Sequence, residues 1–257
     1  MQDKGFFLEP AEGTRKGPEP VLSLVLPAFN ESKKIELTLQ NSVRFLERSN
    51  FDWELIVVDD GSTDGTEDII RRTSHDYPQL VAVRNEQNRG KGYAVKSGIR
   101  RTRGRYVGFM DADYKTDISC LTESLEKLMR GCDIVIGSRT LKESVIENLP
   151  KRSRQIGSRL FNLEVQSMFP ALRRFKDTQC GFKLFQRHAA RDIFSRLVVN
   201  RFTFDVEILH LASLLNYQVC EVPVRWASDP DTRTKLMESI LRNSFDLARI
   251  SRSHRHP

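Results

Sequence analysis

Short apolar runs that end in polar or acidic residues recur through the first half of the chain. They cover residues 21–26, 54–58, 80–83, 105–110 and 133–137. Near-continuous apolar runs of this length are typical of strands that are buried on both faces of a parallel sheet. The pattern therefore predicts strands at these positions.

The segments between these runs carry apolar residues at helical spacing. Residues 31–48 show it most clearly, and residues 64–72, 93–101 and 121–129 repeat it over shorter lengths. Thr63 or Asp64 is expected to cap the second helix. Alternating strands and helices require crossovers that return right-handed to one sheet. We therefore expect an α/β fold: a doubly wound, mostly parallel sheet with helices on both faces and peripheral amphipathic helices.

Composition divides the chain into one domain and two terminal additions. Residues 1–20 are rich in proline, glycine and charge, so we expect a flexible leader, which the apolar residues 6–8 could anchor. Residues 21–234 are expected to form the domain, because 257 residues are too few for two large ones. Residues 235–257 are expected to form a basic helix and tail.

The net charge limits the kinds of partner that we expect, and the cysteine content bears on the cellular compartment. Lysine and arginine exceed aspartate and glutamate, 41 against 34, which favours anionic partners such as nucleotides, phospholipid headgroups or nucleic acid. The cysteines, Cys120, Cys132, Cys180 and Cys220, are too widely spaced for a Cys-x-x-Cys site, and we expect free thiols in a reducing cytosol. No apolar run approaches the ~20 residues that cross a bilayer, so a membrane role is expected to be peripheral.

Acidic residues follow three of the first four predicted strands. They are Glu31 after the first run, Asp59 and Asp60 after the second, and Asp111 and Asp113 after the fourth. The carboxyl ends of parallel strands meet in one crevice, so these carboxylates are expected to converge there. Converging carboxylates repel one another unless hydrogen-bond donors or a cation compensate.

The sequence Asp111-Ala112-Asp113 has the chemistry of a metal site. Carboxylate oxygens bind hard cations such as Mg²⁺ or Mn²⁺, and the phosphates of a diphosphate can complete the coordination shell. The cation would neutralise a departing nucleoside diphosphate. An isolated Asp-x-Asp is usually a capped turn, and residues 59–62 could likewise be only a turn before a helix. The position of both motifs after buried strands favours the functional interpretation.

Cationic residues are predicted beside the same crevice. The loop 88–92, Asn-Arg-Gly-Lys-Gly, places two cations and two permissive backbones just before a helix. That arrangement suits a diphosphate, although a solvated loop has the same composition. Arg139 follows the fifth run, and a guanidinium there can bind a phosphate through two hydrogen bonds.

Taken in order, these motifs resemble those of the inverting family-2 glycosyltransferases with a GT-A fold. The matching strings are 26–31, 58–64, 88–92 and 111–113. Two later strings, 177–185 and 204–209, resemble the polyprenyl-phosphate sugar synthases, the dolichyl-phosphate β-glucosyltransferases above all. The resemblance covers residues 21–240.

The resemblance implies roles for individual residues. It assigns the nucleotide sugar to a set drawn from the strand ends and the basic loop: Pro27, Ala28, Asn30, Glu31, Asp59, Asp60, Lys91, Asp111, Ala112 and Asp113. It assigns the divalent metal to Asp113, as the direct ligand, and to Asp111. It assigns the acceptor phosphate to Arg139, Arg154 and Ser158. The catalytic residues that it implies are Asp111, Asp113, Arg139 and Asp205.

One position departs from the pattern of related proteins. In the polyprenyl-phosphate mannose synthases a Gln two residues beyond the second Asp also binds metal, and here that position is Lys115. An ammonium group cannot coordinate a cation. Lys115 is therefore left out of the metal set, and the coordination is expected to differ.

Residues 151–176 form a basic segment in which apolar residues recur at helical spacing. These apolar positions are Phe161, Val165, Met168, Phe169 and Leu172. Such a helix can lie among lipid headgroups, or it can pack on the core with its charges solvated. The resemblance favours a membrane interface, on the cytoplasmic face. The helix 235–251 is expected either to assist or to cap the domain.

These observations lead to one leading hypothesis and two others. The leading one is a metal-dependent transfer of a hexose, with UDP-glucose favoured over a GDP-sugar, to a polyprenyl phosphate at a membrane surface. The second is a transferase that extends a saccharide, in which Asp205 would accept a hydroxyl proton. The third is a nucleic-acid-binding module, which the acidic crevice disfavours because it would repel phosphates. The oligomeric state stays open.

Overall fold

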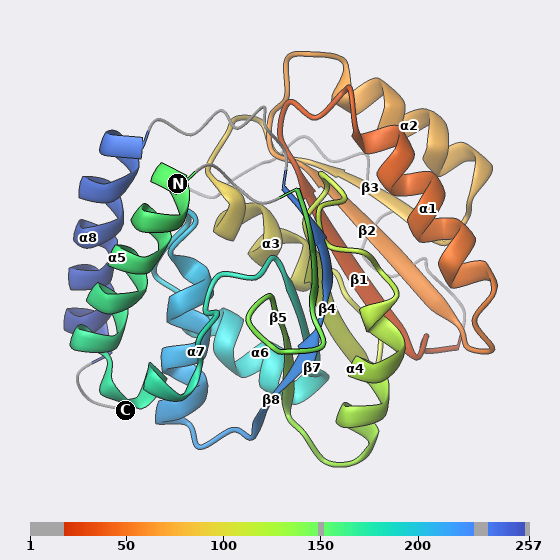
Figure 1. The fold of residues 1–257 in the computed structure, drawn as a ribbon. Helices are drawn as coiled ribbons and strands as arrows, with labels where there is room; N and C mark the ends of the chain where they lie inside the picture. Colours follow the sequence, from red (N-terminus) through yellow and green to blue (C-terminus); the bar gives the residue numbers. More distant parts are fainter. Residues whose placement is uncertain (1–17, 149–151, 229–235, 255–257) are drawn as a thin grey trace.

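The computed structural model describes residues 18–148, 152–228 and 236–254 (Figure 1). Its strands are β1 (Leu22–Ala28), β2 (Trp53–Asp59), β3 (Leu80–Arg84), β4 (Tyr106–Met110), β5 (Ile134–Ser138), β6 (Val145–Glu147), β7 (Phe182–Gln186), β8 (Val219–Pro223) and β9 (Arg225–Ala227). Within these residues, seven strands form one sheet in the order β3-β2-β1-β4-β7-β5-β8, and β6 pairs with β9 separately.

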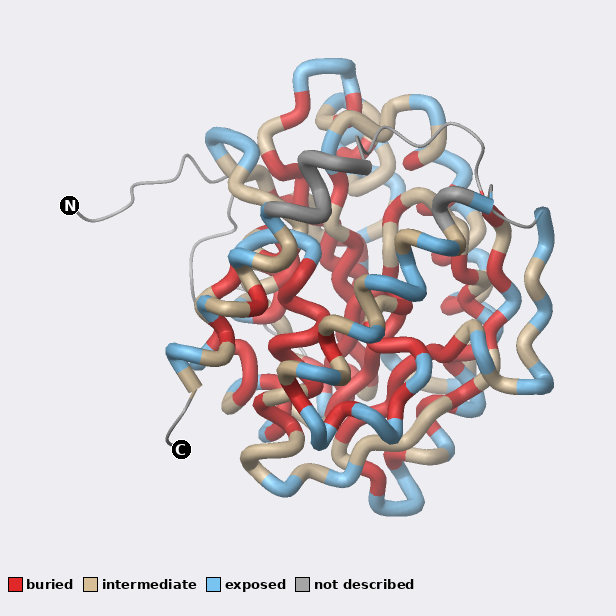
Figure 2. Tube along the Cα trace, turned by 60° about the vertical axis from the view of Figure 1, so that its left-hand side comes forward, coloured by how far each residue is buried: buried red, intermediate tan, exposed pale blue. Residues whose placement is uncertain are grey.

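Helices cover both faces of the main sheet. They are α1 (Ile35–Glu47), α2 (Thr66–Asp76), α3 (Lys91–Ile99), α4 (Cys120–Met129), α5 (Arg152–Met168), α6 (Arg187–Arg196), α7 (Phe204–Leu214) and α8 (Leu236–Ser253), with a 3₁₀ helix, η1 (Pro170–Arg174). Alternate residues of β1 face opposite sides: Leu24 packs in the cluster that includes α1 and α4, and Val25 packs with α3, α6 and α7. Figure 2 shows the resulting buried centre.

The strand directions place several loops at one edge of the sheet. β1, β2, β3 and β4 run parallel, and β5 is parallel to β8. β7 is antiparallel to both β4 and β5, so the loop before it, rather than the loop after it, lies at the carboxyl edge. The segments after β1, β2 and β4 and the segment before β7 therefore meet at the same place.

The predicted fold class and the predicted strands are confirmed, with small differences at element ends. The second helix is capped by Gly65, which has φ +89°, rather than by Thr63 or Asp64. Asp64 still supports the turn, because its Oδ1 accepts hydrogen bonds from the backbone and the hydroxyl of Thr66. The predicted leader lies outside the described residues up to residue 17, as do residues 149–151, 229–235 and 255–257.

The expectation of free thiols is wrong for two cysteines. Cys132, two residues before β5, and Cys220 of the neighbouring strand β8 form a disulfide with Cα atoms 6.2 Å apart. Cys120 and Cys180 are free and buried. The cysteines therefore give no support to a reducing compartment.

The basic segment 151–176 contributes α5 and η1, and the apolar residues named from the sequence face the protein. Val165, Phe169 and Leu172 are buried in the core, and Phe161 and Met168 pack partly against it. The apolar residues that α5 exposes are others: Ile156, Leu160 and Leu163. In the described part of the chain, no helix combines the length and hydropathy of a membrane span.

Candidate active site

The centre of the site is a chain of alternating charges at the carboxyl edge of the sheet. Lys91, the first residue of α3, places its Nζ 2.6 Å from Oδ1 of Asp111, which follows β4. The same ammonium lies 3.8 Å from Oδ2 of Asp205 in the first turn of α7. Lys183 of β7 closes the chain, with its Nζ 2.5 Å from Oδ1 of Asp205. Four side chains from distant parts of the sequence thus form one network, in which Lys183 and Asp205 are buried and Lys91 and Asp111 are partly exposed.

The charge state of Lys91 follows from its neighbours. Burial favours the neutral amine, but Asp111 and Asp205 outweigh burial and raise the pKa of Lys91 well above its usual range. Lys91 therefore stays a cation at every physiological pH. Because it begins a helix, its ammonium adds to the positive end of the α3 dipole, an arrangement that favours phosphate groups.

Asp60 holds the loop that carries Lys91. Its Oδ2 accepts hydrogen bonds from the backbone of Arg89 (3.0 Å) and Gly90 (2.8 Å), and its Oδ1 accepts one from the side chain of Asn85 (2.7 Å). Burial raises the pKa of Asp60, and these hydrogen bonds oppose the rise. The carboxylate after β2 and the carboxylate after β4 are thereby linked through one loop.

Asp59 faces a different partner set. Its Oδ2 lies 2.5 Å from Nη1 of Arg84, and its Oδ1 accepts a hydrogen bond from the backbone of Ser62. Arg84 also pairs with Glu67, at 2.6 Å. Asp59 is therefore directed toward β3 and α2, away from the Lys91 network, and a role in nucleotide binding stays a prediction.

The segment after β1 is tied to the turn after β2. The backbone of Asn30, at φ +52°, donates to Oγ of Ser62, and Oδ1 of Asn30 accepts from the backbone of Thr63. The backbone of Glu31 donates to Oγ1 of Thr66. Of the other predicted nucleotide-sugar residues, Pro27 and Ala28 end β1, and Ala112 is buried with its carbonyl bonded to Thr38.

Asp113 also pairs with a lysine. Nζ of Lys115 contacts Oδ2 of Asp113, and the backbone of Lys115 donates to Oδ1 at 3.3 Å. Each carboxylate of the Asp-x-Asp motif therefore has its own ammonium partner: Lys91 for Asp111 and Lys115 for Asp113.

Arg139, after β5, makes a two-pronged pair with Asp177. Nε and Nη2 of Arg139 lie 2.7 Å from the two carboxylate oxygens, and its backbone also donates to Oδ2. Burial by itself raises the pKa of Asp177, but the hydrogen bonds and charge of Arg139 lower it below its usual value. The guanidinium also lies 5.3 Å from the ring centre of Trp226. Arg139 is thus fixed in one orientation.

The other two predicted acceptor residues lie on α5. Ser158 is exposed, and the side chain of Arg154 lies outside what the structure describes. The structure therefore does not bring Ser158 into the Lys91 network, and the role of both residues stays a prediction.

Glu207, in the same motif as Asp205, supports the fold. Its carboxylate is fully buried and accepts hydrogen bonds from the backbones of Val198 (2.8 Å) and Val199 (2.9 Å). Nε2 of His254, at the end of α8, lies 2.7 Å from the same carboxylate. Glu207 therefore fixes the loop before α7 and the last turn of α8.

Sequence reasoning missed Lys183, Asp177 and Gly181. Lys183 reads as an ordinary polar residue in a strand, and only the fold brings it to Asp205, 22 residues later. Asp177 and Gly181 stand in a recognised motif, but their partners are far away in sequence. A Cβ at Gly181 would collide with the carboxylate of Asp111, so only glycine leaves room for that side chain.

The donor groups fit a hard divalent cation that shares its shell with phosphates. Asp111 and Asp113 supply carboxylate oxygens, and the cradle at Gly181 keeps the first in place. Within the described residues, no cluster of three or more His, Cys, Asp or Glu side chains offers an all-protein cage. Mg²⁺ and Mn²⁺ at diphosphate sites commonly use one or two protein carboxylates, so the pair is sufficient.

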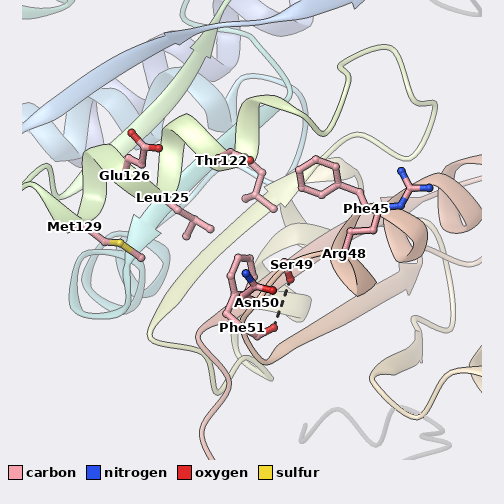
Figure 3. Close-up of a pocket in the computed structure, with 10 residues that line it drawn as sticks. Phe45, Arg48, Ser49, Asn50, Phe51, Thr122, Leu125, Glu126 and Met129 are labelled. Atoms are coloured by element: carbon pink, nitrogen blue, oxygen red, sulfur yellow. Dashed lines mark hydrogen bonds between the residues drawn. The ribbon is translucent and has the colours of Figure 1, made fainter.

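An apolar pocket elsewhere is unrelated to this chemistry. A hollow of about 520 Å³ lies between the end of α1 and α4 and is lined by Phe45, Phe51, Leu125 and Met129 among others (Figure 3). Residues 45–51 precede β2, which begins at Trp53, so the pocket lies toward the amino ends of the strands. It is therefore remote from the carboxyl edge that holds the charged network.

The sheet and the charged carboxyl edge define the class of the protein. The sequence pattern of the family Glycosyl transferase family 2 matches residues 23–194, and the chain belongs to this family. It is a glycosyltransferase with the GT-A fold.

The chain is also similar in sequence to two individual enzymes. The chain is 37% identical over 243 residues to dolichyl-phosphate beta-glucosyltransferase of Dictyostelium discoideum, covering 89% of this chain and 73% of the relative. It is 38% identical over 248 residues to the enzyme of the same name from Drosophila melanogaster, covering 91% and 75%.

Solved structures share the fold at lower identity. Glucosyl-3-phosphoglycerate synthase from Mycobacterium tuberculosis, in complex with Mn²⁺, UDP and glucosyl-3-phosphoglycerate, superposes with a TM-score of 0.66 at 19% identity, over 90% of this chain and 78% of that one. A mannosyltransferase from Pyrobaculum calidifontis, with GDP-Man and Mn²⁺, gives 0.59 at 19% identity, over 90% and 64%.

Proposed function

We propose that the protein transfers glucose from UDP-glucose to the phosphate of a polyprenyl phosphate, with inversion at the anomeric carbon. The observation that carries this proposal is the 37–38% identity to dolichyl-phosphate beta-glucosyltransferases. The choice of UDP is supported by the UDP complex of the Mycobacterium synthase, and the GDP-Man complex of the Pyrobaculum enzyme keeps a GDP-sugar as the alternative.

In this proposal the donor diphosphate lies against loop 88–92. Lys91 is a fixed cation there, because Asp111 and Asp205 hold its ammonium from two sides. A positive charge already in place stabilises the charge that develops on a leaving diphosphate without reorganisation. Asp111 and Asp113 would hold Mg²⁺ or Mn²⁺, which supplies further neutralisation of that charge.

The acceptor needs positioning more than deprotonation. A phosphate oxygen forms the bond to the anomeric carbon while the bond from that carbon to the diphosphate breaks, and UDP leaves with the electron pair. A phosphate monoester is mostly a dianion at neutral pH, with a second pKa of about 6, so no strong base is needed. Arg139 uses Nε and Nη2 for Asp177, so we place the acceptor phosphate at its Nη1.

The geometry disfavours the saccharide-extending alternative. That reaction needs a carboxylate that can take a proton from a hydroxyl, and Asp205 was the candidate. Both oxygens of Asp205 face ammonium groups, Oδ1 toward Lys183 and Oδ2 toward Lys91, and the residue is only 2% exposed. Asp205 is therefore better suited to orient Lys91 than to act as a base.

We place the lipid acceptor at a membrane surface formed by α5, α8 and the loop before α7. Ile156, Leu160 and Leu163 are 57–63% exposed along one side of α5, and Phe202 and Phe245 are also exposed. α5 packs against α8, side by side in Figure 1. Exposed arginines of the same elements and of η1 complete a surface suited to anionic lipid: Arg152, Arg159, Arg173, Arg174, Arg242 and Arg249.

This surface is connected to the proposed donor loop. The carbonyl of Asn200 accepts a hydrogen bond from the backbone of Tyr93, at 3.1 Å, and Gly90 packs against the same carbonyl. Phe202 is two residues further along. A lipid phosphate at the surface would therefore arrive beside loop 88–92. The cytoplasmic face is proposed with it, on the resemblance alone.

A transfer assay tests the proposal. The protein is incubated with radiolabelled UDP-glucose, Mn²⁺ or Mg²⁺, and either dolichyl phosphate in vesicles or an oligosaccharide. We expect label in an organic-extractable, acid-labile product with the lipid, loss of that product with EDTA, and weaker transfer from GDP-mannose. Label in the oligosaccharide alone would overturn the proposal.

A further inference from the structure

The turn after Asp113 is held in place by backbone contacts. Tyr114 has φ +53°, a left-handed conformation that reverses the chain immediately after Asp113. The carbonyl of Lys115 accepts a hydrogen bond from Ala227 of β9 at 2.8 Å, and the backbone of Asp117 donates to Arg225 at 2.9 Å. The backbone of Lys115 is thereby fixed, and its side chain starts from a defined position beside Asp113.

Lys115 engages both oxygens of Asp113. Its backbone donates to Oδ1 and its ammonium contacts Oδ2. The side chains are only 20% and 17% exposed, so solvent screens this pair less than it screens a surface pair. The carboxylate that the sequence assigns as the direct metal ligand is already occupied by a cation of the same chain.

Asp111 differs from Asp113 in how its two carboxylate oxygens are engaged. Lys91 holds its Oδ1, while its Oδ2 faces the glycine cradle at Gly181. Together the two aspartates and their two lysines carry no net charge. A divalent cation that approaches this set alone therefore gains little long-range attraction, until a diphosphate adds negative charge.

We propose that Lys115 competes with the divalent cation for Asp113, and that its ammonium must leave this carboxylate before the cation can bind there. Lys115 thereby weakens binding of the metal alone and makes metal and nucleoside diphosphate bind together. The proposal rests on the metal and diphosphate site of the proposed function. Because coupling is reciprocal, Lys115 must raise the effect of metal on nucleotide binding by the same factor.

Mn²⁺ binding, measured without donor or acceptor, tests the proposal. Free Mn²⁺ is followed by electron paramagnetic resonance in titrations of the wild type, Lys115→Met and the charge-matched control Arg130→Met, a residue at the far end of α4 whose side chain is 80% exposed. We expect Lys115→Met to lower the Kd for Mn²⁺ about 10-fold, equivalent to about 1.4 kcal/mol. Arg130→Met should leave the Kd unchanged.

A second titration in the presence of UDP measures the coupling. UDP should tighten Mn²⁺ binding more in the wild type than in Lys115→Met. Lys115→Leu, which also removes the ammonium and adds no metal ligand, is the second variant and should give the same result. The inference would be overturned if both variants bound Mn²⁺ no more tightly than the wild type does, or if they did not bind Mn²⁺ at all. This titration does not depend on glucose transfer. If the transfer assay fails but Lys115→Met binds Mn²⁺ more tightly than the wild type, the proposed function is wrong and the competition between Lys115 and the metal is still supported.

Discussion

The first part of the molecule, residues 18–138, and the second part, residues 152–254, use charged side chains differently. In the first part, carboxylates follow β1, β2 and β4, and the polar contacts of Asp60 are with Asn85 and loop 88–92 of the same region. In the second part, Lys183 and Glu207 are fully buried and hold α7 and α8 in place. Asp205 belongs to both, because it faces Lys91 as well as Lys183.

The difference separates two kinds of contribution to the site. The first part supplies groups that would contact the nucleotide, arranged by parallel strands that end together. The second part supplies buried charges that orient those groups, and an exposed apolar and basic surface beside them. Variants in the second part should therefore change stability or lipid binding, and variants in the first part should change transfer.

The largest expected effect is on stability, from Lys183→Met. This change leaves Asp205 buried without its closest partner, and breaking such a pair costs about 3–5 kcal/mol in the free energy of unfolding. The double variant Lys183→Met/Asp205→Leu should recover much of the loss. Denaturant unfolding measures both, with the exposed Arg71→Met as the control, expected below about 1 kcal/mol. A double variant as unstable as the single one would contradict this account.

Next in size is the effect of Asp111→Asn on transfer. The substitution keeps the shape in the Gly181 cradle but removes the charge that holds Lys91 and would hold the metal. We expect kcat to fall about 10²–10³-fold, as for other losses of preorganised charge. Initial rates with UDP-glucose and dolichyl phosphate measure it. Asp68→Asn, on the exposed side of α2, is the matched control. Full activity of Asp111→Asn would show that the site lies elsewhere.

The exposed apolar side of α5 gives a smaller effect. Replacing Ile156, Leu160 and Leu163 together by Ser should weaken binding to anionic vesicles about 10–100-fold, because the apolar area buried in lipid is lost. Vesicle sedimentation measures the change. Transfer to a short-chain, water-soluble polyprenyl phosphate should be retained. If vesicle binding is unaltered, the surface that contacts lipid is another one.

The smallest expected effect is on the pH dependence of stability, and it arises from a residue of the second part. Burial, and to a lesser degree His254, lower the pKa of His210 from 6.5 to about 4. At a pH between these two pKa values, the unfolded chain binds a proton that the folded protein does not. The neutral, buried His210 therefore contributes fully to stability above pH 6.5, and that contribution is lost as the pH falls toward 4. His210→Phe should reduce the wild-type loss between pH 7 and 5.5 by about 1 kcal/mol in denaturant unfolding. An identical pH profile would rule this out.

The sequence was most informative where a pattern is local. Buried parallel strands such as β1 and β2 produce continuous apolar runs, and acidic residues at their ends mark one edge of the sheet, so the fold class and the position of Asp111 at that edge could be predicted. The antiparallel entry of β7 could not, because a single strand carries no sign of its direction. For the same reason nothing local indicated that Lys183 would meet Asp205.

The exposed surface of α5 illustrates a second limit. Helical spacing identified an amphipathic helix, but it did not say which of two apolar sides faces the core. Val165 belongs to the buried side, whereas Ile156 and Leu160 belong to the exposed one. Tertiary packing decides between them, and a single sequence does not contain that packing explicitly.

The ion pair between Arg139 and Asp177 closes the base of a long excursion of the chain. The intervening residues carry β6, α5 and η1 before the chain returns to the sheet at β7. Because the ends are fastened at the carboxyl edge, the cost of lengthening the excursion is small, about 0.6 kcal/mol for each doubling. Such an excursion can therefore change in length or sequence while the strands β1, β2 and β4 and the charged side chains at their carboxyl ends stay unaltered.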